Sequence, residues 1–459
     1  MTKANQPFDS ALNPPLSDLY DLITGDEDAR VCKDIPPESC NDQPANFFAY
    51  LGANLLTKVA DELCSAKLIL PWLLGALGSP AALVGMLVPI REAGVLVPQL
   101  AVAAYIRRLP LRKVVWIWGS LLSAAALAVM ALAAATLSGA VAGWVIIGLL
   151  VLFSLARGLC SVSAKDVLGK TVSKARRGNL MGISAGTAGV LTLALGLYLQ
   201  FVTGDRTERV LFVGLLGAAA ILFAAAVLSF QYVREQPGAT EGGGNALTAA
   251  AKNVTLLRTD PLFRRFVLVR IALLSTALAP PFYVLLVQGG SDGELTGLGL
   301  LIIASGLASS ISAPVWGRFS DRSSRMVMAL ASAAAGVVGI ITFLLARTDL
   351  AFSQQPYLFA SLFLVLNIAH SGVRLGRKVY LVDMATSETR AAMVAVSNTA
   401  IGIAMLGAGL IGCIADLFDA ATVILVLAAG SLGASFYALR LAEVSEPAGS
   451  PVGQGRTIA

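Results

Sequence analysis

The sequence predicts an all-α polytopic membrane protein whose twelve transmembrane helices form two pseudo-symmetric six-helix halves. Hydrophobic residues make up 56% of the 459 residues and charged residues only 14%, whereas an average soluble domain carries about 25% charge. The apolar residues fall in continuous runs long enough to cross a bilayer as helices, which takes about 20 residues each. Similar residues also recur at one constant spacing along the chain. This composition argues against a cytosolic enzyme, a disordered chain and a nucleic-acid-binding domain.

Twelve apolar segments, separated by short polar or glycine- and proline-containing turns, are the predicted transmembrane helices. They lie near residues 47–76, 82–105, 113–138, 141–164, 178–202, 209–232, 265–288, 295–316, 326–346, 357–380, 391–414 and 420–440. A long polar interruption with three consecutive glycines separates the first six from the last six and is typical of a flexible linker. The predicted parts are an acidic N-terminal tail at 1–45, an N-terminal half at 46–232, a linker at 233–264, a C-terminal half at 265–441 and a C-terminal tail at 442–459.

Basic residues are concentrated in the loops that follow the even-numbered spans. The opposite side of the predicted bundle has only Arg206, Arg209 and Arg347. The positive-inside rule therefore places the basic loops, the linker and both termini in the cytoplasm. The first 45 residues carry nine acidic and three basic side chains, without the basic and apolar segments of a cleaved signal peptide. We expect a multi-pass protein of the cell (inner) membrane with cytoplasmic N- and C-termini.

The cysteines and tryptophans give no sign of a bound metal or cofactor. The five cysteines have no ligand-like spacing, and Cys32 and Cys40 would lie in a reducing compartment, so we expect neither a disulfide framework nor a metal site. The tryptophans all lie near predicted span ends, as in an interfacial belt; they are Trp72, Trp116, Trp118, Trp144 and Trp316.

An internal repeat relates the two halves at a spacing of 213 residues. Its matched pairs fall at corresponding span ends, and they include Arg112 with Arg325, Lys165 with Lys378, Ser184 with Ser397, Gly189 with Gly402 and Gly196 with Gly409. Six spans, a linker and six similar spans predict two parallel repeats related by an axis along the membrane normal. In span 5, Gly182 and Gly186 have the GxxxG spacing that favours close helix packing.

The loop between spans 8 and 9 carries the most specific motif, from Gly317 to Arg325. It resembles the signature loop of the major facilitator superfamily, a Gly followed by Asp-Arg/Lys and Gly-Arg, with Ser324 in place of the second Gly. The resemblance covers the chain after residue 45. It implies a gating loop in which Asp321 and Arg325 hold the two halves together in one alternating state; the gating residues are Gly317, Arg318, Asp321, Arg322 and Arg325. The alternative is a solvated loop whose charges set the topology.

Charged residues inside spans 1 and 2 are candidates for function because each costs about 2.5–3.5 kcal/mol to insert. In span 1, Lys58, Asp61 and Glu62 share one helix face at spacings of three and four residues. Arg91 and Glu92 in span 2 lie at a similar predicted depth. We expect an intrahelical pair between Lys58 and a carboxylate, with Arg91 bridging the spans. Either this cluster is structural, or one of the three carboxylates accepts the proton that drives a conformational change.

Spans 4, 7 and 10 supply a second set of candidates. The repeat superposes Arg157 on His370, and Arg374 follows one turn later in span 10. The resemblance implies that spans 1, 4, 7 and 10 line a central cavity, to which Arg270 in span 7 also belongs. These side chains would attract an anion, since arginine suits carboxylate and phosphate. Arg157 and Arg374 could instead pair at a gate, and His370 could be a packing residue. Arg377 and Lys378, farther along span 10, are expected to be anchors at the cytoplasmic boundary of the membrane.

The sequence thus predicts a secondary active transporter that moves a small solute by alternating access. An organic anion is the favoured solute and protons are the favoured coupling ion, with no cofactor. A single histidine and the absence of a convergent catalytic set argue against an enzyme. The alternatives are a drug or metabolite exporter of the same fold and a non-transporting membrane receptor or scaffold. The expected partners are the solute, protons and the lipid bilayer, with no nucleic acid, and we expect a monomer.

Overall fold

The computed structural model describes residues 20, 23, 35, 37–106, 108–201, 208–238, 255–290, 295–320, 322–348, 355–386 and 389–444. Within these ranges the chain forms helices and no β-strand, which confirms the predicted all-α fold class. Many large apolar side chains are exposed around the bundle, among them Leu132, Ile221 and Leu410. Such a surface is suited to lipid rather than to water.

The N-terminal half consists of helices that follow the predicted spans closely. They are α2 (Pro37–Asn41), α3 (Gln43–Leu63), α4 (Ile69–Ala76), α5 (Ala81–Leu96), α6 (Gln99–Ile106), α7 (Lys113–Thr136), α8 (Gly139–Thr171), α9 (Lys174–Phe201) and α10 (Glu208–Phe230). Span 1 is divided into α3 and α4 by a turn at 64–68, and span 2 into α5 and α6 next to Pro98. Proline lacks the N–H that a continuous helix requires, which accounts for the second break.

The C-terminal half repeats this pattern. Its elements are α12 (Leu256–Thr259), α13 (Pro261–Ala272), α14 (Leu274–Leu278), α15 (Pro280–Gly290), α16 (Leu295–Ser320), α17 (Ser324–Ala346), α18 (Pro356–Met384), α19 (Arg390–Ala408), the 3₁₀ turn η3 (Gly409–Ile411), α20 (Gly412–Leu417) and α21 (Ala420–Leu439). Span 7 corresponds to α13, α14 and α15, and span 11 to α19, η3 and α20. Consecutive prolines at the start of α15 and glycines around η3 explain why these two spans are segmented.

Eleven segments of the described chain are long and apolar enough to cross a membrane. The segment that falls short is span 1, because its apolar run is divided at 64–68 and α3 carries Lys58, Asp61 and Glu62. Both α3 and α4 are nevertheless in the bundle, where α3 packs against α9 and α10 and α4 packs against α5 and α15. The twelve predicted spans therefore all correspond to helices, and span 1 is the least apolar of them.

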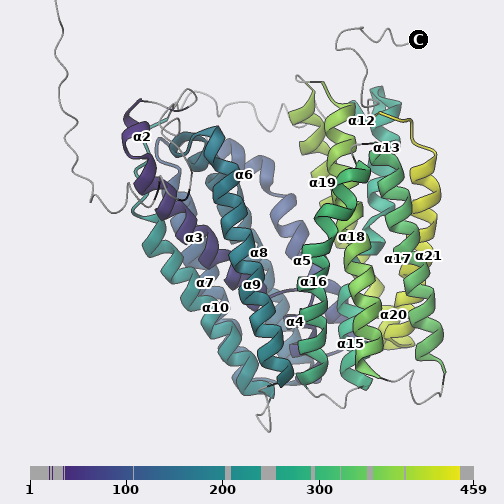
Figure 1. Ribbon diagram of the computed structural model, residues 1–459. Coiled ribbons are helices and arrows are strands. Elements are labelled where there is room, and N and C mark those ends of the chain that lie inside the picture. Colours follow the sequence, from purple (N-terminus) through teal and green to yellow (C-terminus); the bar gives the residue numbers. More distant parts are fainter. Residues whose placement is uncertain are drawn as a thin grey trace, which may run out of the picture.

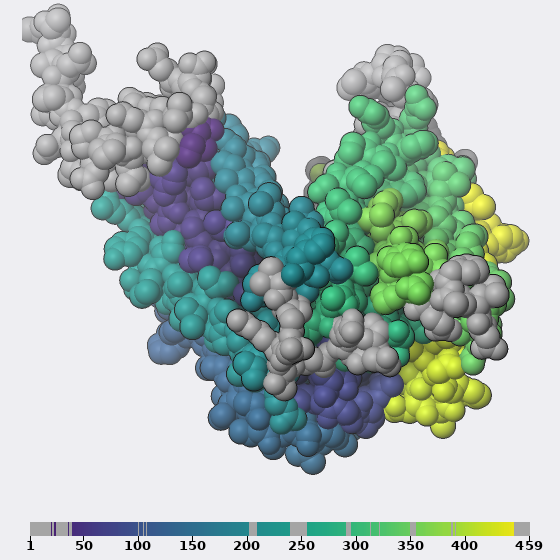
Figure 2. Space-filling view, turned by 60° about the horizontal axis from the view of Figure 1, so that its bottom comes forward, coloured from purple at the N-terminus to yellow at the C-terminus, as the bar shows by residue number. Residues whose placement is uncertain are grey.

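The two halves lie side by side, close at one end and apart at the other (Figure 1). They meet where α9 packs against α16, and where α5 packs against α19, η3 and α20. Where α2, α6 and α12 lie, the halves separate, and the space-filling view shows the surface hollowed between them (Figure 2). We call the separated end, which carries the basic loops, the open side, and the other end the closed side.

Glycines matched by the internal repeat mark the junction between the halves. A side chain at Gly196 of α9 would meet Ile302 and Ile303 of α16, and one at Gly409 of η3 would meet Pro89 of α5. Both members of this predicted pair thus face the opposite half. No other part of the described chain lies within 4 Å of where a Cβ on Gly182 or Gly186 would stand, so the expectation of close packing at their GxxxG spacing is wrong.

We expect Gly412→Ala to push the halves apart on the closed side. A Cβ on Gly412 would lie 2.6 Å from the Ala82 carbonyl oxygen and 2.9 Å from the Cα of Gly85, and backbone atoms of α5 cannot move aside locally. Overpacking of this kind costs about 1–3 kcal/mol. Spin labels on cysteines introduced at the exposed Ser138 and Gln355, one on each half, should report a longer distance in this variant.

Gly407→Ala is the matched control for that experiment. Gly407 lies in α19, five residues before Gly412, and no other part of the described chain lies within 4 Å of where its Cβ would stand. The label-to-label distance should stay at the wild-type value in the control. An unchanged distance in Gly412→Ala as well would contradict the close contact between α5 and α20.

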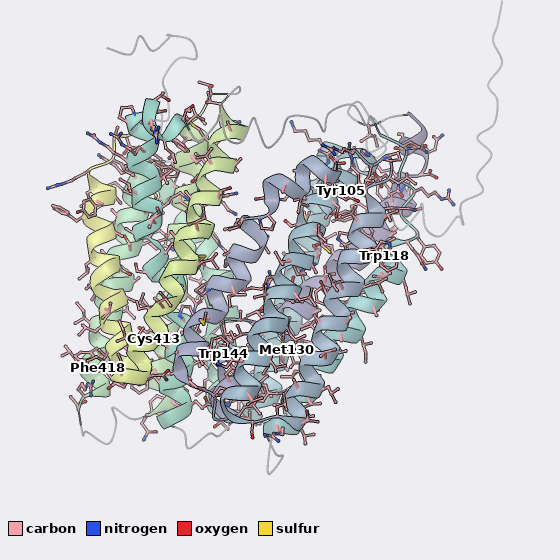
Figure 3. The ribbon with its side chains drawn as sticks, turned by 180° about the vertical axis from the view of Figure 1, so that it is seen from behind. Tyr105, Trp118, Met130, Trp144, Cys413 and Phe418 are labelled. Carbon is pink, nitrogen blue, oxygen red and sulfur yellow. The ribbon has the colours of Figure 1, made fainter. Side chains whose placement is uncertain are left out.

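The tryptophans fulfil the predicted belt only in part. Trp118 and Trp144 are exposed and lie toward opposite ends of the N-terminal half (Figure 3). Trp72 and Trp116 are buried, and the Trp116 ring stacks on Phe230 at 3.9 Å between ring centroids. These two tryptophans are therefore core residues, because their helix faces point into the bundle.

The cysteines also depart from expectation. Cys64, Cys160 and Cys413 are free thiols. Cys40, in α2 on the open side, is disulfide-bonded, where we expected reduced thiols. The disulfide and the basic loops therefore indicate different compartments for the open side, because a reducing cytoplasm would convert such a bond to two thiols.

Candidate functional site

A cavity runs between the two halves and is lined by both. It has two parts of about 380 Å³ and about 530 Å³ whose linings overlap. The residues shared by both parts are Lys67, Val88 and Glu92 from the N-terminal half and His370 and Arg374 from the C-terminal half. The larger part continues along α18 past Lys378 to Val382, toward the open side.

A three-helix ion cluster forms the N-terminal wall of the smaller part. Asp61 of α3 accepts from Arg91 of α5 at 3.0 Å and from Arg157 of α8 at 2.5 Å, one guanidinium on each carboxylate oxygen. The predicted bridge from Arg91 to span 1 is present, and Arg157 extends it to span 4. Each guanidinium also lies over an aromatic ring, Arg91 over Phe153 at 5.1 Å and Arg157 over Phe223 at 5.0 Å. The Asp61 carboxylate is therefore fully occupied by cations.

Arg157 lies behind the central cavity rather than in it. Its guanidinium lines a separate cavity of about 200 Å³ within the N-terminal half. The predicted equivalence of Arg157 and His370 therefore holds for chain position but not for environment, since His370 lines both parts of the central cavity. His370 is buried, and its Nδ1 lies 3.2 Å from the Thr276 hydroxyl.

Lys58 does not make the predicted intrahelical pair with a carboxylate. Its ammonium donates instead to the Ser184 hydroxyl of α9 at 3.2 Å, and Asn54 donates to the same oxygen at 2.8 Å. The repeat shows the same arrangement in the C-terminal half, where Arg270 of α13 donates to Ser397 of α19. Two serines matched at the 213-residue spacing thus each accept a hydrogen bond from a basic residue on the first span of their own half.

Arg270 is both a lining residue and a structural one. It borders the larger part of the cavity, but its guanidinium is buried and held by Ser397 and by Asn398 Oδ1, the latter at 3.4 Å. Phe266 lies beside it, with its ring centroid at 5.8 Å. This guanidinium is less available to a ligand than the other cations of the cavity.

In the described chain, two carboxylates and four cations of the cavity form no ion pair with one another. No hydrogen bond or ion pair joins Glu62 or Glu92 to another part of the chain that the structure describes, although Lys67 interacts electrostatically with both. The cations are Lys67, Arg374, Arg377 and Lys378. The last three follow one another at i, i+3 and i+4 on α18 and so share one helix face. The cavity therefore has a cationic wall contributed mainly by α18.

Three of these cations were not among the predicted site residues. Arg377 and Lys378 follow the apolar part of span 10 and were interpreted as anchors at the membrane boundary. Lys67 lies in the turn at 64–68, which was predicted to be continuous helix. The break in span 1 brings Lys67 into the cavity. For Arg377 and Lys378, the sequence held one indication of a place in the cavity, which is their helical spacing from Arg374 along α18.

The predicted gating loop makes its contacts within its own half in this structure. Arg325 pairs with Glu443 at 3.4 Å and donates to the Leu441 carbonyl at 3.0 Å, whereas Asp321 lies outside the described residues. A Cβ on Gly317 would meet no other part of the described chain within 4 Å, and Arg318 and Arg322 are exposed. The repeat partner of Arg325 behaves alike, because Arg112 pairs with Asp166 of its own half. The described part of the loop does not bridge the halves while the open side is open.

Comparison with known proteins agrees with this architecture. The family described as Major Facilitator Superfamily matches residues 45–346 and again residues 271–457. The chain belongs to the major facilitator superfamily. This membership confirms the resemblance carried by the loop between spans 8 and 9, and it makes the chain a transporter rather than an enzyme. No curated protein matched the sequence.

Solved structures of the major facilitator superfamily share the fold at low sequence identity. The nucleoside transporter NupG is 15% identical, with a TM-score of 0.61 over 86% of this chain and 98% of that one. The inward open conformation of the xylose transporter XylE from E. coli is 11% identical, with a TM-score of 0.62 over 87% and 96%. A POT family transporter in complex with 5-aminolevulinic acid is 11% identical, with a TM-score of 0.64 over 86% and 95%. At these identities the likeness extends to the fold alone.

Proposed function

We propose that this chain is a secondary active transporter that carries a small organic anion through the cavity between its halves, coupled to protons. The observation that carries the proposal is the charge of the described cavity lining. Three carboxylates face it (Asp61, Glu62 and Glu92) against six cations (Lys67, Arg91, Arg270, Arg374, Arg377 and Lys378). Asp61 is already shared by two guanidinium groups, so the remaining cavity has an excess of positive charge that an anionic cargo would balance.

We further propose that the open side faces the cytoplasm. The loops on this side carry most of the basic residues, as the positive-inside rule requires of cytoplasmic loops. The similarity to an inward open transporter structure supports the same orientation. In the other alternating state the contacts between α5 and α20 and between α9 and α16 would open, and the cavity would face the opposite side.

The test is a thermal-shift screen of the purified protein followed by uptake into proteoliposomes. Acetate, succinate, citrate and glycerol 3-phosphate serve as anions, with xylose, a nucleoside and choline as neutral and cationic comparators. A cargo that binds the folded protein raises its apparent melting temperature. We expect stabilisation by an anion and none by the comparators. Stabilisation and uptake restricted to a neutral or cationic solute would overturn the proposal.

Arg374→Gln should weaken anion binding in this screen on the order of 30-fold, since a hydrogen bond to a charged group contributes about 2 kcal/mol. Arg374 borders both parts of the cavity, and no partner in the described chain competes for its guanidinium. Arg440→Gln is the matched control, because it removes the same charge from the exposed end of α21. Equal loss of affinity in the two variants would mean that overall charge, and not the cavity, attracts the anion.

A further inference from the structure

Glu92 occupies a position unlike that of the other two carboxylates of the cavity. Asp61 is held by Arg91 and Arg157, and Glu62 is exposed at the end of α3. Glu92 borders both parts of the cavity and interacts electrostatically with Lys67 from the N-terminal half and Arg377 from the C-terminal half. It is the carboxylate of the described cavity that lies among the cations available to a cargo.

The charged and titratable groups around Glu92 come from four neighbouring elements. They are Asp61 and Glu62 of α3, Lys67 of the turn at 64–68, Arg270 of α13, and His370, Arg374, Arg377 and Lys378 of α18, besides Arg91 on α5 itself. From α16 and α19 the described lining is uncharged, with Ser305, Ser309 and Asn398 as its polar members. Glu92 is thus a single negative charge that faces mostly positive ones.

We infer that the cargo is an anion with at least two acidic groups, and that its negative charge takes the place of that of Glu92 in balancing Lys67 and Arg377 when Glu92 takes up a proton. The inference rests on the proposed function. A charged Glu92 and a charged cargo compete for the same cations, so each weakens the binding of the other. When Glu92 is neutral, only Glu62 remains to balance four cations, which are Lys67, Arg374, Arg377 and Lys378. Three positive charges are then left over, more than a cargo with one carboxylate can balance.

This competition would couple proton and cargo without direct contact between them. Proton uptake by Glu92 removes a negative charge that partly balances the cations, and binding of the anion then favours the neutral form of Glu92. By reciprocity the proton and the anion strengthen each other's binding by the same factor. A transporter that carries the proton and the anion across the membrane together in this way is a symporter for a polyanion and a proton.

The experiment measures the affinity of wild type, Glu92→Gln and Glu62→Gln for succinate, citrate and glycerol 3-phosphate between pH 5.5 and 8, with acetate as the monoanion. In wild type we expect affinity to rise as pH falls, by up to about tenfold per unit for one linked proton. Glu92→Gln should bind tightly at every pH, because the amide cannot compete. Glu62→Gln removes the other negative charge that faces these cations, so it should raise the affinity for polyanions while the wild-type dependence on pH remains, because Glu92 is still present.

Proteoliposome assays separate coupling from transport itself. Glu92→Gln should still exchange internal for external anion but should fail to accumulate it when a proton gradient is applied. Lys67→Gln provides a second variant, which should bind every polyanion more weakly while its response to pH remains. Wild-type pH dependence and accumulation in Glu92→Gln would overturn the inference, and so would acetate binding as tightly as the polyanions. If wild type binds no anion at all, the proposed function itself fails, and this outcome is distinct from the other two.

Discussion

Replacing Asp61 with asparagine is expected to lower the free energy of unfolding by about 3 kcal/mol, since removal of one partner from a buried ion cluster leaves uncompensated charge. Two guanidinium groups, those of Arg91 and Arg157, lose their shared carboxylate in Asp61→Asn. The three side chains are largely buried, with 17–25% of their surface exposed, so water can replace the carboxylate only in part. The loss should appear as a lower apparent melting temperature in detergent and as loss of uptake in proteoliposomes.

Glu62→Gln provides the matched control for this variant. Glu62 follows Asp61 in the same helix and is exposed, with no ion pair in the described chain. Its replacement should change stability by no more than about 0.5 kcal/mol, as for most surface positions. The double variant Asp61→Asn with Arg91→Gln should recover part of the loss, because it removes one of the two unpaired cations. If Asp61→Asn proves as stable as Glu62→Gln, the cluster does not hold spans 1, 2 and 4 together.

The sequence predicted the spans well because hydropathy is a property of each segment by itself. Even the four interrupted spans kept their limits, since a break such as the turn at 64–68 does not change the apolar content around it. The internal repeat was equally informative at Gly196 and Gly409, which face the opposite half as a matched pair. Because the two halves have the same fold, residues matched at one constant spacing occupy equivalent positions in the two halves.

Side-chain partners were harder to predict because they depend on how each helix is rotated about its axis. Counting depth along spans 1 and 2 was enough to bring Arg91 to Asp61. It could not show that Arg157 of α8 reaches the same carboxylate, or that Lys58 turns to Ser184 instead. Arg377 was treated as a boundary anchor because the separation of the halves, which extends the cavity along α18, is absent from any one-dimensional pattern.

The closed side carries a contact that bears on which conformation the chain adopts. The carboxylate of Asp416 in α20 accepts hydrogen bonds from the backbone N–H groups of Ala81 at 2.7 Å and Ala82 at 3.1 Å. These groups begin α5, whose N-cap residue, Pro80, has no side chain able to cap them. A helix of one half is thus capped by a carboxylate of the other, which also meets the positive end of the helix dipole.

We therefore expect Asp416→Ala to favour opening of the closed side. Loss of an N-cap carboxylate costs about 1 kcal/mol of stabilisation, and loss of its interaction with the helix dipole adds a further fraction. Together these correspond to a shift of roughly tenfold in the conformational equilibrium toward opening of the closed side. Spin labels at positions 138 and 355 should show a larger population at long distance than in wild type. A distance distribution identical to that of wild type would mean that the contact forms without holding the halves together.

Asp419→Ala distinguishes the contact between Asp416 and α5 from helix capping within one half. Asp419 lies three residues after Asp416 and caps α21 of its own half through the Thr422 N–H at 2.7 Å, while pairing with Arg347 at 2.6 Å. Its loss should lower the melting temperature of the protein but leave the label-to-label distance unchanged, because both partners move with the C-terminal half. Asp416→Ala should instead change the label-to-label distance. Its carboxylate joins the two halves, which must separate on the closed side for the cavity to face the other side of the membrane.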